Sequence, residues 1–243
     1  MLRELRYFAA TLLFACCSFA CWNHPLTGIP GPSEAGEDSL GLLLPLLGVA
    51  GGETASNPVR LIFRTATNYN GNLQAGGGGV TEGDAICAAE ATAFGYAGTY
   101  KALLGTEVIA ATPRFACRNA FCSPPDPTDG TNWVLGANVD YYRASDNAFI
   151  GTSTADRIFR FPLSNPYSPL PGAWHWGGFF RDWRPPSGPG SPGFGNNDFN
   201  AWTGTTGNGW ISYSFETSDQ AIYSGTTAGA TNPNMFLVCV GQL

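Results

Sequence analysis

The sequence predicts an α+β fold: a domain of short antiparallel strands with one or two helices and a long irregular loop region, placed after an N-terminal signal and a disordered tether. Its 243 residues are 44% apolar and 13% aromatic, which is enough for a substantial core. Only 12% of the residues are charged, while 32 Gly and 18 Pro favour loops and short strands over long helices. Prolines crowd the stretch between about residues 164 and 209, which marks the irregular region.

The acidic balance of the chain argues against nucleic acid as a partner. The formal net charge is −6 at pH 7 and the isoelectric point is close to 4.8. Arginines and lysines are scattered singly, so no continuous basic stripe follows a phosphate backbone. We therefore expect no nucleic-acid partner.

The first residues are typical of a bacterial secretion signal. Arg3 and Arg6 precede an uncharged apolar run over residues 8–15, which is too short to span a bilayer as a helix. The sequence therefore predicts an exported protein, in which disulfides are expected to form.

Two cysteines near the end of the signal region, residues 1–20, resemble the acylated cysteine of bacterial lipoproteins. Cys16 has Leu13 three positions before it and an alanine directly before it. Cys21 also follows an alanine, but has Ser18 in the third position. We expect cleavage and acylation at Cys16 or Cys21, with Cys16 favoured, and hence a lipid-anchored protein at the surface of the outer membrane. The alternative is an ordinary cleaved signal and a secreted or periplasmic protein.

Residues 22–58 have the composition of a flexible tether. Proline, glycine and acidic residues dominate it, and they leave too little apolar surface for a core. An apolar run over residues 40–50 is interrupted by Pro45, so it is too short to cross a membrane. The folded domain is therefore expected over residues 59–243.

The cysteines of the domain predict two disulfides. Cys87, Cys117, Cys122 and Cys239 permit three pairings in an exported chain. Cys117 and Cys122 are close enough in sequence to close a small loop, which leaves Cys87 to pair with Cys239. No second close cysteine pair is present, so we expect no structural metal site.

The predicted elements are short. An opening strand is expected over residues 59–66 because apolar and polar side chains alternate there. A helix of about three turns that carries Cys87 is expected to begin near Thr81 and to end near Gly95. Further strands are predicted over residues 99–104, 133–135, 140–143, 158–161, 211–215 and 235–240. The aromatic content of the region 164–209 indicates an ordered, functional segment in place of a disordered one.

The sequence lacks the arrangement of residues that nucleophilic catalysis needs. His175 is the one histidine of the domain, and it lies between two tryptophans with no serine or acidic partner nearby in sequence. Glu82 and Asp84 are interpreted as helix N-terminal charges. The sequence does not exclude a catalytic pair of carboxylates that only folding brings together. We nevertheless expect that the protein is not an enzyme and has no cofactor.

The densest cluster of aromatic and arginine residues lies over residues 174–184. Side chains of this kind supply much of the binding energy in protein interfaces. Trp176, Phe179 and Trp202 are expected in the core. The candidate ligand-binding residues, which we expect to be exposed, are His175, Arg181, Trp183 and Arg184.

Several short motifs carry a resemblance to a known family. They are Gly98-Thr-Tyr-Lys-Ala-Leu-Leu104, Asn132-Trp-Val-Leu135, Tyr141-Tyr-Arg143, Trp176-Gly-Gly-Phe179 and Leu237-Val-Cys-Val240. Together they resemble leptospiral-type surface lipoproteins, whose C-terminal domain of unknown function belongs to the C-type-lectin-like superfamily, as does the endostatin-like domain of related adhesins. The resemblance implies that fold for residues 59–243. It also implies a core role for Trp176 and a bond between a helix cysteine and a last-strand cysteine, matching Cys87 and Cys239.

The sequence departs from this family in two places. The segment before Trp202 lacks the cysteine that often forms a further disulfide there. The acidic and amide triplets that hold calcium in sugar-binding lectins are also missing. Asn196, Asn197, Asp198 and Asn200 offer oxygens, but we interpret them as turn-capping residues and expect no metal.

These expectations combine into a functional hypothesis. The protein is a lipid-anchored, surface-exposed and non-catalytic binding protein. By resemblance to adhesins, its expected partner is a macromolecule such as a host extracellular-matrix or complement protein. A structural envelope lipoprotein without an external ligand and a carbohydrate-binding lectin are the alternatives.

Overall fold

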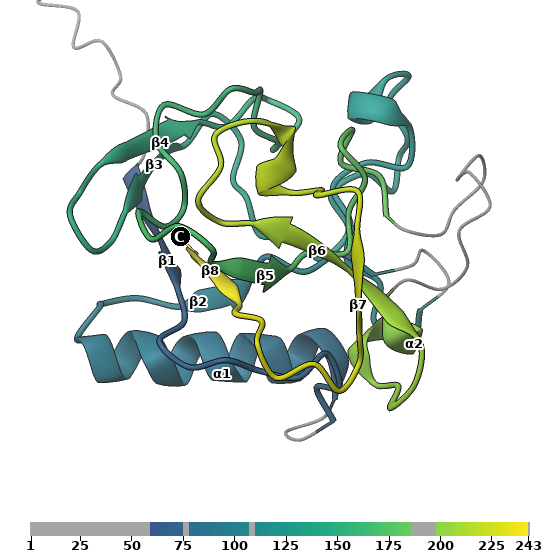
Figure 1. Cartoon of the computed structure of the whole chain (residues 1–243). Coiled ribbons are helices and arrows are strands. Elements are labelled where there is room, and N and C mark those ends of the chain that lie inside the picture. The colour runs from purple at the N-terminus through teal and green to yellow at the C-terminus, as the bar shows by residue number, and fades with distance from the viewer. Residues whose placement is uncertain (1–58, 75–77, 107–109, 186–197, 243) are drawn as a thin grey trace, which may run out of the picture. The chain divides into compact units, whose positions relative to one another are not determined.

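The computed structural model describes residues 59–74, 78–106, 110–185 and 198–242 (Figure 1). The signal region with Cys16 and Cys21, the tether over residues 22–58, and Asn196 with Asn197 lie outside the described residues.

A five-stranded sheet organises one side of the domain. It contains β1 (Val59–Arg64), β2 (Tyr100–Ala102), β3 (Asp140–Arg143), β4 (Phe149–Thr152) and β8 (Val238–Gly241) in the order β2-β8-β1-β3-β4. Neighbouring strands are antiparallel except β1 and β3, which are parallel. The expectation of antiparallel strands is wrong for this pair, because the long connection through the helix returns the chain to the same end of the sheet.

The helix α1 (Gly79–Phe94) packs against β2 and β8 of this sheet, as Figure 1 shows. Its buried stripe includes Val80, Gly83, Cys87 and Ala91, which recur every three or four residues along one helix face. A Cβ at Gly83 would lie 2.9 Å from the Cδ1 of Leu104, so glycine permits the close approach.

Both ends of α1 are set by glycines. The helix ends at Gly95, as the sequence predicts, and Gly95 adopts a left-handed φ of 75° that suits a residue without a Cβ. The expected start near Thr81 is two residues too late, because Gly78 is the N-cap and the helix begins at Gly79.

The second sheet has three antiparallel strands. These are β5 (Trp174–Trp176), β6 (Asn208–Tyr213) and β7 (Thr227–Gly229), in the order β5-β6-β7. The remaining elements are the short helix α2 (Phe199–Trp202) and two 3₁₀ helices, η2 (Ala120–Cys122) and η3 (Asp219–Ala221). One apolar cluster, which includes Cys87, Trp176 and Trp202, packs at α1, and a second includes Tyr141, Phe159 and Trp183.

Two disulfides close the domain. Cys87 of α1 bonds to Cys239 of β8 across 152 residues, with their Cα atoms 5.5 Å apart. Cys117 bonds to Cys122 across five residues. These are the two pairings that the sequence predicts.

Two predicted strands are absent at their expected places. Residues 133–135 and 158–161 are irregular, and residues 133–135 are buried together with Ile158 and Phe159. Trp133 donates its indole N–H to the carbonyl of Arg157 at 2.6 Å. Their β-prone side chains reflect burial in the core and not strand pairing. Among the described residues, no helix is both long and apolar enough to cross a bilayer.

Candidate functional site

Trp183 is a core residue, and the expectation that it is exposed is wrong. The side chain is fully buried, and its indole N–H donates to the carbonyl of Phe159 at 3.1 Å. The ring of Phe161 stacks on it, with 5.9 Å between centroids and 10° between the planes. The backbone N–H of Trp183 donates to the carbonyl of Phe180 at 2.9 Å, and this tight turn directs the tryptophan inward.

His175 is also buried, which corrects the same expectation. It lies opposite Ser212 in the β5–β6 ladder, and its ring packs edge-on against Tyr167 at 6.2 Å. Its side chain is only 1% exposed, and burial lowers the pKa of His175 from 6.5 to about 3. The imidazole is therefore neutral near pH 7 and is not available to a surface ligand.

The two arginines of this segment have different roles. Arg184 is half-buried and forms an ion pair with Asp182, with 2.8 Å between Nη2 and Oδ2, so it stabilises the turn around Trp183. Arg181 is exposed, and its guanidinium lies 5.7 Å from the ring centroid of Tyr223. No ion pair of Arg181 is found within the described part of the chain. Of the four candidate ligand-binding residues, Arg181 is the exposed one, and it forms no ion pair with the residues that the structure describes.

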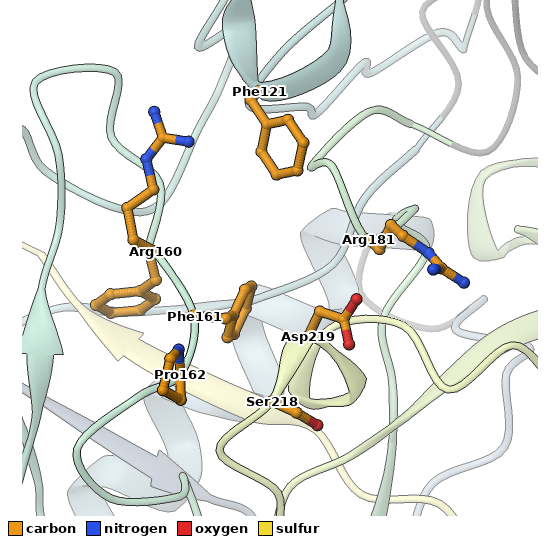
Figure 2. Close-up of a pocket in the computed structure, with 8 residues that line it drawn as sticks. Phe121, Arg160, Phe161, Pro162, Arg181, Ser218 and Asp219 are labelled. Carbon is orange, nitrogen blue, oxygen red and sulfur yellow. The ribbon is translucent and has the colours of Figure 1, made fainter.

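Arg181 lines a pocket of about 440 Å³, shown in Figure 2. The volume is within the range of small-ligand and side-chain binding sites. The apolar walls are formed by Phe121, Phe159, Phe161 and Pro162. The polar groups are Arg160, Arg181, Ser218 and Asp219. Four segments that are distant in sequence therefore meet at one site.

The small disulfide loop supplies Phe121. This residue lies in the Cys117–Cys122 loop, directly before Cys122, with a left-handed φ of 52°, and its side chain is 41% exposed. Its backbone N–H donates to the carbonyl of Asp182 at 2.9 Å. The loop is thereby tied to the turn that carries Arg181.

The opposite wall depends on the buried tryptophan. Phe161 stacks on Trp183, so the core packing of Trp183 sets the position of a ring in the pocket. The N–H of Leu163 donates to the carbonyl of Thr217 at 2.7 Å, which joins this segment to the chain just before η3. Asp219 at the start of η3 completes the site.

The charge of the pocket is positive on two sides. Arg160 is exposed, and its guanidinium lies 5.7 Å from the ring centroid of Phe121. Figure 2 shows Arg160 and Arg181 on opposite sides of Phe161, with Asp219 between Phe161 and Arg181. In the described residues neither arginine forms an ion pair. The site can therefore take an apolar group and pair with anionic groups beside it.

A second concave site of the described domain has fewer side chains that are free to contact a ligand. A pocket of about 230 Å³ has Asp126, Asp129 and Asp156 in its wall, but the carboxylates of Asp126 and Asp129 accept hydrogen bonds from their own loop. Asp198, one of the oxygen-bearing residues of the sequence, is buried in a bridge to Gly209. Within the described ranges no cluster of three side chains is arranged to hold a metal ion.

Sequence reasoning missed Phe121, Arg160 and Asp219. The spacing of Cys117 and Cys122 was a usable signal, because a large aromatic residue inside so short a disulfide loop is difficult to bury. No local sequence pattern predicts that Arg160 and Asp219 line the same pocket, since only folding brings them to it.

The fold and the site define a class of protein: a disulfide-bonded α+β domain that presents an aromatic and arginine-lined pocket built from loops. The chain belongs to a family described as protein of unknown function (DUF1554), whose pattern matches residues 66–233. The matched range contains every residue that lines the pocket. No curated protein matches the sequence.

Proposed function

We propose that this protein is a lipid-anchored, surface-exposed binding protein without catalytic activity, and that the pocket between Phe121 and Phe161 is its contact site. The observation that carries the proposal is a pair of exposed arginines at an aromatic pocket, neither of which forms an ion pair with another described residue. Aromatic and arginine side chains are the groups that dominate binding energy in protein interfaces. In a chain of net charge −6, a pocket with two arginines and one aspartate indicates a ligand that carries negative charge.

The finer fold assignment belongs to the same proposal. We assign the domain to the C-type-lectin-like superfamily, with support from the disulfide between a helix and the last strand. Further support comes from the position of the pocket, whose Arg181 lies in the irregular region between about residues 164 and 209. Surface adhesins of this superfamily make a host extracellular-matrix or complement protein the proposed partner.

The absence of catalysis is supported by the state of His175. A general base must reach the substrate, and this imidazole is buried with a pKa lowered to about 3. Its Nδ1 has no hydrogen-bond partner among the described residues, so no carboxylate orients it.

The proposal is tested with the full chain displayed on intact cells. Binding of laminin, fibronectin and complement regulators is measured for the wild type and for the double variant Arg160→Gln, Arg181→Gln. The matched control is Lys101→Gln, Arg157→Gln, which removes the same charge on β2 and at a different pocket. We expect the pocket variant to lose capture of a partner and the control to retain it.

Two outcomes contradict the proposal. If the two double variants capture the partner equally well, the contact site lies outside the pocket. Protection of the domain from protease added to intact cells contradicts surface exposure and favours a structural envelope lipoprotein.

A further inference from the structure

We propose that the pocket recognises an acidic peptide segment in which a large apolar side chain enters between Phe121 and Phe161 while carboxylates on its flanks pair with Arg160 and Arg181. This inference rests on the proposed function and names the chemistry of the partner at the same site. It is carried by the composition of the pocket walls and by the placement of the charges.

The apolar part of the ligand follows from the walls. The ring of Phe121 is 41% exposed, although a free aromatic ring of this kind is costly to leave in water. Phe161 is held in place by its stacking on Trp183, so the opposite wall is preformed. A pocket of about 440 Å³ has room for one large side chain together with part of the backbone that carries it. The walls therefore favour an aromatic or large aliphatic anchor.

The charged part of the ligand follows from the two arginines. Both arginines line the pocket, and both guanidinium groups lie near aromatic rings, Arg160 over Phe121 and Arg181 over Tyr223. Neither has an ion-pair partner within the described residues, in contrast to Arg184, which is held by Asp182. A planar guanidinium pairs well with a carboxylate through two parallel hydrogen bonds.

The net charge of the protein favours a short peptide over a long polyanion as the ligand. A sulfated polysaccharide extends far beyond the pocket and meets the field of a chain with net charge −6. Asp219 also places a carboxylate in the pocket on the Arg181 side (Figure 2). A short peptide places its carboxylates near the arginines and extends less far over the acidic protein, so it meets less of this repulsion than a long polyanion does.

The test is a binding measurement on the full chain purified in detergent. The probe is a fluorescent peptide with one tryptophan flanked on each side by two glutamates. Two matched peptides replace either the tryptophan by alanine or the glutamates by glutamines, and a heparin-derived oligosaccharide represents the polyanion. We expect the first peptide to bind at least about tenfold more tightly than either matched peptide, with an affinity that falls as salt is added.

The variants place the binding at the pocket. Arg160→Gln and Arg181→Gln are each expected to weaken binding about tenfold, because each removes a charge-assisted pair. Phe121→Ala is expected to remove the preference for tryptophan over alanine in the peptide. The double control Lys101→Gln, Arg157→Gln is expected to leave the affinity unchanged.

Three results overturn the inference. They are equal binding of the acidic peptide and its glutamine analogue, equal affinity in the pocket variants and the control, and tighter binding of the oligosaccharide than of the peptide. The proposed function can hold even where this inference fails. If capture of a matrix or complement protein depends on Arg160 and Arg181 but the acidic peptide does not compete, the pocket remains the contact site and only the ligand class is wrong.

Discussion

Trp183 donates its indole N–H to Phe159 and stacks on Phe161, so one buried side chain joins the core to a pocket wall. His175 is buried in the same region, opposite Ser212 and against Tyr167. Hydroxyl and ring groups surround it, and they offer no charge to stabilise an imidazolium. The domain therefore depends on a neutral His175, and this dependence has a measurable consequence.

The free energy of unfolding of the domain is expected to decrease as the pH is lowered, because of His175. Burial lowers the pKa of the folded-state imidazole from 6.5 to about 3, so the unfolded chain binds the proton more readily. The contribution is fully present above pH 6.5 and is lost as the pH falls toward 3, at about 1.4 kcal/mol per pH unit. The measurement is the free energy of unfolding in denaturant at a series of pH values.

His175→Gln is the control for this effect, because the amide does not titrate. Between about pH 6.5 and 5, where most carboxylates keep their charge, the variant is expected to show a flatter pH dependence than the wild type. Identical slopes in the two proteins would show that His175 is not buried as described.

At the scale of elements, predictable and unpredictable features have different physical origins. The end of α1 follows from Gly95, the strands β1 and β3 from alternating side chains, and β8 from a continuous run of β-prone apolar residues. β5 and β7 are only three residues each, so they carry too short a pattern to recognise. Ile158 and Phe159 are β-prone side chains that are buried in the core without strand pairing, and such burial depends on tertiary packing.

The same limit applies to the charges of α1. The sequence interpretation places Asp84 as a helix N-terminal charge, but the helix begins at Gly79 and Asp84 lies beyond its first turn. Its carboxylate instead forms two hydrogen bonds with Arg114, at 2.6 and 2.7 Å, and accepts the N–H of Ala102. The pair connects α1 to β2 and to the loop that precedes the small disulfide.

Asp84→Asn is expected to destabilise the domain by about 3 kcal/mol, because it leaves the buried Arg114 guanidinium without its counter-charge. The side chain of Arg114 is 1% exposed. Asp146→Asn, which weakens the more exposed pair with Arg143, is expected to cost less than about 1 kcal/mol. Chemical denaturation measures both values, and equal losses would contradict a special role for the buried pair.

For the whole molecule, the Cys87–Cys239 disulfide joins the helix to the last strand and closes most of the domain. In the chain-entropy description, cross-linking a loop of this length contributes roughly 5 kcal/mol. The Cys117–Cys122 loop contributes less to stability, but it carries Phe121 into the pocket. The two disulfides therefore have different roles, one in stability and one in the site.

The double variants separate these roles. Cys87→Ser, Cys239→Ser is expected to lower the free energy of unfolding by roughly 5 kcal/mol, and Cys117→Ser, Cys122→Ser by about 2 kcal/mol. The second variant is expected to remain folded but to lose binding at the pocket. Retained binding in a folded Cys117→Ser, Cys122→Ser protein would show that the loop does not position Phe121.

The proposed lipid anchor is tested by metabolic labelling with a fatty-acid analogue. The wild type is expected to incorporate the label and to remain with the membrane fraction, while Cys16→Ser, Cys21→Ser does neither. The single variants identify the acylated cysteine. An unlabelled wild type would favour the ordinary cleaved signal.

The most direct measurement of the central claim is site-specific photo-crosslinking from the surface of intact cells. A photoreactive phenylalanine analogue is placed at Phe121 or at Trp174, two large apolar side chains with nearly equal exposure of 41% and 40%. Only Phe121 lines the pocket. In the presence of matrix and complement proteins, we predict covalent adducts from Phe121 and none from Trp174. Adducts from Trp174 in equal yield, or none from Phe121, would contradict the assignment of the pocket as the contact site.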